Sequence, residues 1–336
     1  MSDTSTKFSV QDEDQAIGDE ELATIREACD EIRAQVSEVY VGSPEVVDAL
    51  LVAMLSGGHI LMEGVPGVAK TTLCRAFAAT LGARFRRIQF TPDLLPADIT
   101  GNFVPDLQQQ RFELRRGPVF ANIVLGDEIN RAPAKTQAAL LEAMQERQVT
   151  IEGETMELPE PFMVLATQNP VEQQGVYPLP EAQLDRFLMK LRLGYPSQEQ
   201  EMEVLRRHRQ RVPMPEQSVK ASEVVEMAAW VEKVHVEEEL IEYIVGLVRR
   251  TRVDRDTTLG ASPRATLALL RVAQAHALLR GRGYVLPDDI RVFAAPVLAH
   301  RLVLHRDAEL EGLSQEEVVG RALKKVSYAK TGRERG

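Results

Sequence analysis

The sequence predicts an α/β fold, a parallel five-stranded sheet between layers of helices, followed by a C-terminal domain made only of helices. Short, nearly continuous apolar runs alternate with helical patterns as far as Pro196, which is typical of parallel strands joined by helices. From Gln198 onwards only helical patterns recur. Pro196-Ser197 is therefore the predicted boundary between a core over 19–196 and a helical lid domain over 197–329.

Two helices begin the core. Apolar residues three and four positions apart from Leu22 to Val39 predict the first, and Ser43 as N-cap followed by Pro44 predicts the start of the second. Strands are predicted at 59–63, 85–90, 119–125, 162–167 and 189–193. Further helices are predicted at 73–81, 199–209, 223–234, 238–252, 263–280 and 287–300. His59 is expected to pack at the start of the first strand rather than to bind a ligand.

The composition and the chain ends limit the class of protein. The 50 acidic and 40 basic residues give a formal net charge of −10, which disfavours nucleic acid as a partner. No apolar run approaches the roughly 18 residues that span a bilayer, and the N-terminus has no signal-peptide core, so we expect a cytoplasmic protein without membrane insertion. Residues 1–18 and 330–336 lack periodicity, which predicts a disordered acidic N-terminal tail and a mobile C-terminal tail.

A phosphate-binding loop follows the first strand, where Gly-Val-Pro-Gly-Val-Ala-Lys-Thr-Thr leads into a helix-forming stretch. Backbone N–H groups of such a loop point at the β-phosphate of a nucleotide, Lys70 reaches the β- and γ-phosphate oxygens, and the Thr71 hydroxyl ligates Mg²⁺. The general motif has glycine where this chain has Ala69, and we expect the loop to tolerate alanine if its φ stays negative. The predicted cofactors are ATP and Mg²⁺, bound by Gly64, Val65, Pro66, Gly67, Val68, Ala69, Lys70, Thr71, Thr72 and Asp127.

Two acidic residues end the third predicted strand. Asp127 is predicted to hold Mg²⁺ together with Thr71, and Glu128 beside it to accept a proton from the attacking water. Asn169, at the end of the fourth strand, is predicted to orient that water or to contact the γ-phosphate. This set of groups indicates nucleotide hydrolysis.

Two arginines are candidates for stabilising the charge that develops during phosphoryl transfer. Arg186 precedes the last predicted strand, and Arg264 opens a helix of the second domain behind Ser262. A guanidinium on the γ-phosphate can come from a neighbouring subunit or from a lid. Arg131, just after Glu128, can either contact the start of the next helix or reach across a subunit boundary, and the sequence leaves both open.

These motifs resemble those of MoxR-type AAA+ ATPases. The similar segments are residues 64–71, 127–133, 166–170 and 178–187, and the resemblance extends from about residue 22 to residue 304. It implies a hexameric ring in which Asp127 is the Walker B metal-site carboxylate, Glu128 the base and Asn169 sensor 1. It also implies that Arg186 is an arginine finger acting on the neighbouring subunit and that Arg264 is sensor 2.

Two predicted β-hairpins interrupt the core. Residues 102–114 have apolar residues on both sides of a polar turn, and 149–158 alternate around Glu152-Gly153. They resemble the helix-2 insert and the presensor-1 hairpin of the same family. In a ring, this resemblance places them at the central channel or at the partner surface. The other interpretation is that they are simply edge hairpins.

The resemblance implies Mg-dependent ATP hydrolysis by an oligomeric ring, coupled to chaperone-like remodelling or maturation of a protein client or adaptor, often one with a von Willebrand factor A domain. Two alternatives remain. A magnesium-chelatase-like or helicase-like motor is the first, although the acidity of the chain argues against a helicase. An ATP-gated assembly scaffold with little turnover is the second, and the presence of Glu128, Arg186 and Arg264 argues against it.

Overall fold

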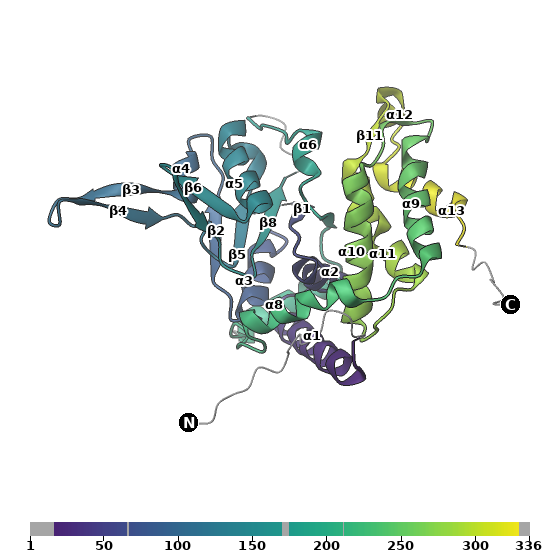
Figure 1. Ribbon diagram of the computed structural model, residues 1–336, viewed down its shortest axis with the longest axis horizontal. Helices are drawn as coiled ribbons and strands as arrows, with labels where there is room; N and C mark the ends of the chain where they lie inside the picture. The colour runs from purple at the N-terminus through teal and green to yellow at the C-terminus, as the bar shows by residue number, and fades with distance from the viewer. Residues whose placement is uncertain (1–16, 66, 170–174, 211, 329–336) are drawn as a thin grey trace. The chain divides into compact units, whose positions relative to one another are not determined.

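The computed structural model describes residues 17–65, 67–169, 175–210 and 212–328 (Figure 1). They form two compact units, of which one contains 28–187 and 191–225 and the other contains 17–27, 188–190 and 226–328. Pro196 lies within the first unit, and the division of the chain at that residue stays a prediction. The predicted tails lie outside the described residues except for residues 17 and 18, as do Pro66 and Pro170. No helix among the described residues is long and apolar enough to cross a membrane.

A five-stranded sheet has the strand order β2-β5-β8-β1-β9. Its strands are β1 (Ile60–Gly64), β2 (Phe85–Gln89), β5 (Ile123–Asp127), β8 (Met163–Gln168) and β9 (Met189–Leu193). The pairs β2–β5, β5–β8 and β8–β1 are all parallel. The predicted parallel α/β core is therefore confirmed, and the carboxyl ends of β1 and β5 lie at the same edge of the sheet, on either side of β8.

The third strand begins four residues later than the sequence predicts. Val119 and Ala121 are buried, which explains why residues 119–122 look like part of an apolar strand, but they form a turn. The Asn122 side chain stabilises this turn, since its amide nitrogen donates to the carbonyls of Glu160 and Pro161 at 3.1 Å each. Its Oδ1 accepts the backbone N–H of Arg84 at 3.1 Å. Ladder pairing therefore starts only at Ile123.

Most of the remaining elements up to residue 229 are helices. They are α1 (Asp19–Val39), α2 (Pro44–Leu55), α3 (Lys70–Thr80), α4 (Pro96–Thr100), η1 (Ile129–Arg131), α5 (Ala134–Glu146), α6 (Glu181–Leu184), α7 (Gln198–Gln210) and α8 (Ala221–Ala229). Ser43 and Pro44 take the predicted N-cap and first positions of α2, although the Ser43 hydroxyl donates to the Glu45 carboxylate and makes no cap bond with the helix backbone. Phe90, Phe162 and Phe187 are among the fully buried side chains of the core.

Both predicted hairpins are present. One consists of β3 (Gly101–Asp106) and β4 (Arg111–Arg116), and Figure 1 shows this ribbon projecting beyond the helices and strands at its base. The other consists of β6 (Gln148–Ile151) and β7 (Glu154–Glu157), joined by Glu152 and Gly153, which both have positive φ, as a type I′ turn requires. Val149 and Ile151 are buried, so the second hairpin packs one of its faces against the core.

The second unit is mainly helical, with one short strand pair that the sequence does not predict. Its elements after α8 are η2 (Val231–Lys233), α9 (Glu238–Arg252), β10 (Thr257–Leu259), α10 (Pro263–Leu279), α11 (Pro287–Leu298), η3 (Ala299–Arg301), β11 (Val303–Leu304), α12 (Arg306–Leu310) and α13 (Gln315–Lys325). β10 and β11 pair antiparallel. Two strands of three and two residues are too short to show an alternating pattern, which explains why periodicity misses them.

His59 is a packed residue, as expected, and it connects three segments of the core. Its Nδ1 accepts the backbone N–H of Val164 in β8 at 3.0 Å, so the proton of the neutral ring must lie on Nε2, which is 3.0 Å from the carbonyl of Met144 in α5. Burial, and to a smaller extent the nearby positive charge of Arg147, lower the pKa of His59 to about 3, while the bond to the Met144 carbonyl opposes this shift. The folded protein therefore keeps this imidazole neutral far below the pH at which a free histidine is protonated.

The depressed pKa of His59 makes the folded state less stable in acid. In the unfolded chain this histidine takes up a proton below its ordinary pKa of 6.5, whereas in the folded chain it stays neutral down to about pH 3. Between pH 7.5 and 5.5 we expect wild type to lose about 1.4 kcal/mol more unfolding free energy than His59→Asn. Urea titrations at the two pH values measure this difference. His208→Asn, at an exposed histidine of α7, is the control and should behave as wild type. Equal losses in all three proteins would contradict the prediction.

Candidate nucleotide-binding site

The predicted phosphate loop connects β1 to α3. Lys70 is the first residue of α3, and its Nζ donates to the carbonyl of Gly64 at 2.8 Å. Gly64 has to be glycine because a Cβ there would lie 2.7 Å from the backbone oxygen of Leu193 in β9. Gly67 has a φ of +90°, which side chains rarely allow. Close approach to β9 and backbone conformation thus explain the two described glycines of the loop.

The backbone of Ala69 lies in the left-handed region, with a φ of +56° and a ψ of 24°, and not at the negative φ that the sequence analysis expects. Left-handed backbone costs an alanine about 1–2 kcal/mol, because its Cβ approaches the following carbonyl oxygen. Ala69 is the N-cap residue of α3, and an N-cap residue lies outside helical geometry. The expectation of a negative φ is therefore wrong, and the loop contains a strained alanine. Val65 and Val68 belong to the same loop, whereas Pro66 lies outside the described residues.

The acidic pair lies at the end of β5, and Thr167 of β8 contacts both members. The Thr167 hydroxyl donates to Oδ1 of Asp127 at 2.6 Å and accepts the backbone N–H of Glu128 at 2.9 Å. Glu128 has a φ of +58°, so the chain turns sharply directly after the strand. The sequence analysis does not identify Thr167, although it is a polar residue at the end of an apolar strand, inside a segment already similar to the family motif.

Side chains from β2 contact the outer side of the acidic pair. Arg87 donates to Oδ2 of Asp127 from Nε at 3.0 Å and from Nη2 at 2.6 Å. Gln89 donates from its amide nitrogen to Oε2 of Glu128 at 2.7 Å. Arg87 and Gln89 are two positions apart, and side chains two apart project from the same face of a strand. The sequence analysis identifies neither residue, because their role depends on β2 lying beside β5.

Arg131 forms an ion pair within its own chain. Its Nε lies 3.3 Å from Oε2 of Glu128, three residues earlier, across the turn η1. This pair lies within the turn η1, before α5 begins, so both sequence-based interpretations of Arg131 stay predictions. Arg131 and Gln89 together place two donors on the carboxylate of Glu128.

Lys70 is close enough to the acidic pair to be influenced by its charge. Burial lowers the pKa of the Lys70 ammonium below its usual value, and the negative charges of Asp127 and Glu128 oppose this shift. Thr71 and Thr72 are half-buried in the first turn of α3, where the backbone N–H groups of a helix attract anions. The loop, the helix start and the acidic pair therefore form one site.

The donors of this site suit Mg²⁺ held partly by a nucleotide. Among the described residues there is no group of three or more histidine, cysteine or acidic side chains that could hold a metal by itself. Mg²⁺ in nucleotide sites commonly takes one or two protein oxygens, with water and phosphate oxygens completing its shell. The hydroxyl of Thr71 and the carboxylate of Asp127 are oxygen ligands of that kind, so the residues fit this ion.

The other predicted site residues lie on three different segments. Asn169 is buried just after β8, and Arg186 is half-buried between α6 and β9. The strand order places β9 beside β1, so Arg186 lies on the strand connection next to the phosphate-loop strand. The end of β9 approaches Gly64, whereas Arg186 precedes its start, and five residues of strand span about 17 Å. Arg264 is exposed at the start of α10 in the second unit.

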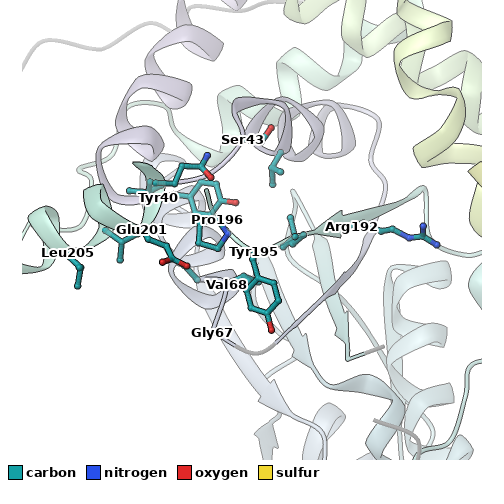
Figure 2. A pocket seen from close by; sticks show the side chains of 17 residues that line it. Tyr40, Ser43, Gly67, Val68, Arg192, Tyr195, Pro196, Glu201 and Leu205 are labelled. Atoms are coloured by element: carbon teal, nitrogen blue, oxygen red, sulfur yellow. The ribbon is translucent and has the colours of Figure 1, made fainter. Parts of the chain in front are cut away.

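A pocket of about 500 Å³ adjoins the phosphate loop within the first unit (Figure 2). Its volume lies in the range of small-molecule sites, and most of its lining is apolar or aromatic. The lining residues are Tyr40, Val41, Gly42, Ser43, Val46, Gly67, Val68, Ala69, Arg192, Leu193, Gly194, Tyr195, Pro196, Gln200, Glu201, Val204 and Leu205. A nucleoside whose phosphates lie on the loop can place its base here. The pocket is not predictable from local sequence patterns, because it combines three segments that are distant in the chain.

Two family models match the chain. The ATPase family associated with various cellular activities (AAA) matches residues 59–189, and the AAA lid domain matches 249–322. Chaperone MoxR1 of Mycobacterium tuberculosis is 46% identical over 302 residues, which cover 87% of this chain and 80% of that protein. The chain belongs to the MoxR family of AAA+ ATPases. The resemblance inferred from the motifs is confirmed.

Two more proteins are similar to most of this chain. YeaC of Bacillus subtilis is 49% identical over 286 residues, covering 84% of this chain and 89% of that protein. The crystal structure of a protein assigned as an ATPase from Cytophaga hutchinsonii has a TM-score of 0.87 and 44% identity, covering 93% of this chain and 98% of that one. This MoxR-family chain is thus an ATPase with an AAA nucleotide-binding core and an AAA lid.

The strain at Ala69 can be tested by replacing the residue. Ala69→Gly should raise the free energy of unfolding by about 0.5–1 kcal/mol, because the relief of left-handed strain exceeds the entropy that glycine adds to the unfolded chain. Ala76→Gly, in the middle of α3, is the control and should lower stability by about 1 kcal/mol or more. Urea unfolding of the nucleotide-free protein measures both. A loss of stability in Ala69→Gly as large as in the control would show that residue 69 is not left-handed in solution.

Proposed function

We propose that this MoxR-family chain hydrolyses ATP with Mg²⁺ in an oligomeric ring, and that the nucleotide cycle remodels or matures a protein partner. One observation carries the hydrolytic part of this proposal. The hydroxyl of Thr167 fixes both Asp127 and Glu128 at the end of β5, at the same edge of the sheet as the phosphate loop that follows β1.

Each group of the site has a role that follows from its chemistry. Lys70 exchanges the Gly64 carbonyl for phosphate oxygens, and backbone N–H groups of the loop and of α3 bind the phosphates beside it. Thr71 and Asp127 would hold Mg²⁺, which supplies positive charge for the phosphate oxygens. Glu128 accepts the proton of the attacking water, and Asn169 orients that water.

The ring and the protein partner are proposed from the family resemblance, the name of a relative and the exposed residues of the β3–β4 ribbon. Arg186 would act on the nucleotide of a neighbouring subunit and Arg264 would act from the lid, in a hexamer as the family resemblance implies. The name of the relative Chaperone MoxR1 supports a chaperone-like activity, and a client with a von Willebrand factor A domain belongs to this proposal as well. On the projecting β3–β4 ribbon, Leu107 is 87% exposed and Phe112 is 72% exposed, which suits contact with a protein partner.

Replacing the proposed base should separate binding from hydrolysis. Glu128→Gln keeps a hydrogen-bonding side chain of the same size but removes the proton acceptor, so turnover should fall about 10²-fold or more while ATP affinity is retained. Phosphate release and calorimetry measure the two properties. Glu142→Gln, at an exposed position of α5, is the control and should match wild type. Wild-type turnover in Glu128→Gln would place the base elsewhere, and no turnover in the wild type would favour a nucleotide-gated scaffold.

The role of Arg186 can be tested with mixed subunits. Arg186→Ala should lower turnover by about 10³-fold with its own ATP site intact, and Lys70→Ala should lose ATP binding. A mixture of these two variants should recover some activity, because some interfaces then join an intact nucleotide site to an intact arginine. Phosphate release across mixing ratios measures this, once sedimentation has shown that subunits exchange.

Two results would contradict a role of Arg186 between subunits. One is activity in the mixture that never exceeds the sum of the two separate variants. The other is full activity of wild type as a monomer at high dilution. In either case Arg186 would have a role confined to its own chain.

A further inference from the structure

Arg87 saturates one oxygen of the carboxylate that the proposed function assigns to Mg²⁺. A carboxylate oxygen offers about two lone-pair positions, and both N–H groups that Arg87 donates to Asp127 go to Oδ2. Oδ1 already accepts the Thr167 hydroxyl. The guanidinium of Arg87 therefore occupies both lone-pair positions of Oδ2.

The pair lies where a guanidinium can leave without disturbing the core. The Arg87 side chain is 47% exposed, whereas that of Asp127 is 14% exposed. Because the guanidinium side chain is already half in water, its departure leaves no buried positive charge without a partner, and a divalent cation can take its place beside Asp127. The ion pair of Arg321 with Asp254 in the second unit is more buried, since the Asp254 side chain is only 5% exposed.

Arg87 also contacts the residue that restrains Glu128. Its Nη2 donates to Oε1 of Gln89, whose amide nitrogen donates to Oε2 of Glu128. Movement of the guanidinium would remove the bond that orients the Gln89 amide. The contacts of Asp127 and Glu128 with β2 are thus coupled through one side chain.

We infer that Arg87 is an internal counter-cation of Asp127 that a divalent cation displaces when nucleotide binds. This inference rests on the proposed function, because it assumes that Asp127 helps to hold the cation. Two cations at one carboxylate repel each other, so the guanidinium has to leave Oδ2 as the divalent ion approaches. Arg87 is then a positioning residue, and its presence makes the site bind divalent cations more weakly than Asp127 alone would allow.

The test measures divalent-cation affinity rather than turnover. Mn²⁺ is titrated into the complex of the full chain with ADP, and free Mn²⁺ is measured by electron paramagnetic resonance. Arg87→Gln should bind Mn²⁺ about fivefold more tightly than wild type, the upper limit for an exposed ion pair. Arg87→Lys keeps the positive charge and should stay close to wild type.

Arg86 provides a matched control on the same strand. It is exposed, adjacent to Arg87 and on the opposite face of β2, so Arg86→Gln changes the net charge by the same amount away from Asp127. Its Mn²⁺ affinity should equal that of wild type. Calorimetry of ADP without divalent cations should give the same affinity for all four proteins.

Four results would overturn the inference, and the last of them would also overturn the proposed function. Unchanged or weaker Mn²⁺ binding by Arg87→Gln would show that the arginine does not compete with the cation. Equal gains in Arg86→Gln and Arg87→Gln would reduce the effect to net charge. Loss of metal-free ADP affinity in Arg87→Gln would make Arg87 a phosphate ligand instead. If wild type binds ADP but shows no Mn²⁺ dependence, the proposed function fails first, and the inference fails with it.

Discussion

The hydroxyl of Thr167 fixes the geometry of the acidic pair. It accepts the N–H of Glu128 and donates to Asp127, so a side chain of β8 supports the sharp turn at the end of β5. This contact requires the parallel register that sets Gly126 beside Ala166, because a shift by one residue would turn Thr167 to the other face. Thr167 is fully buried, and without it the Glu128 N–H would lose its partner where water does not replace it easily.

β9 has a comparable role for the nucleotide pocket. Leu193 at its end approaches Gly64 so closely that only glycine fits, and the residues from Arg192 to Pro196 then line the pocket beside Gly67 and Val68. The distance between the phosphate loop and the pocket wall is therefore set by strand packing and not by the loop alone. Displacement of β9 would therefore move the pocket wall away from the phosphate loop.

The sequence predicts the groups that follow one another along the chain better than those that meet across strands. Lys70, Asp127 and Glu128 are identified because short motifs at strand ends have a fixed chemical meaning. Arg87 and Gln89 are missed, since only the order β2-β5 brings them to the acidic pair. Local sequence patterns also predict the backbone conformation poorly at two positions. Ala69 adopts a positive φ that its residue type disfavours, and the start of β5 depends on Asn122 bonds to residues 38 and 39 positions away.

Three charged groups of this site, those of Lys70, Asp127 and Glu128, have partners within the chain. Lys70 donates to the Gly64 carbonyl, Asp127 accepts from Arg87, and Glu128 accepts from Gln89. Ligand binding therefore exchanges partners, and its free energy is the difference between new and old contacts. Desolvation has already occurred in part for these groups, which favours binding, but each old contact opposes it. Residues that never touch the nucleotide can consequently change its affinity by changing the stability of the free form.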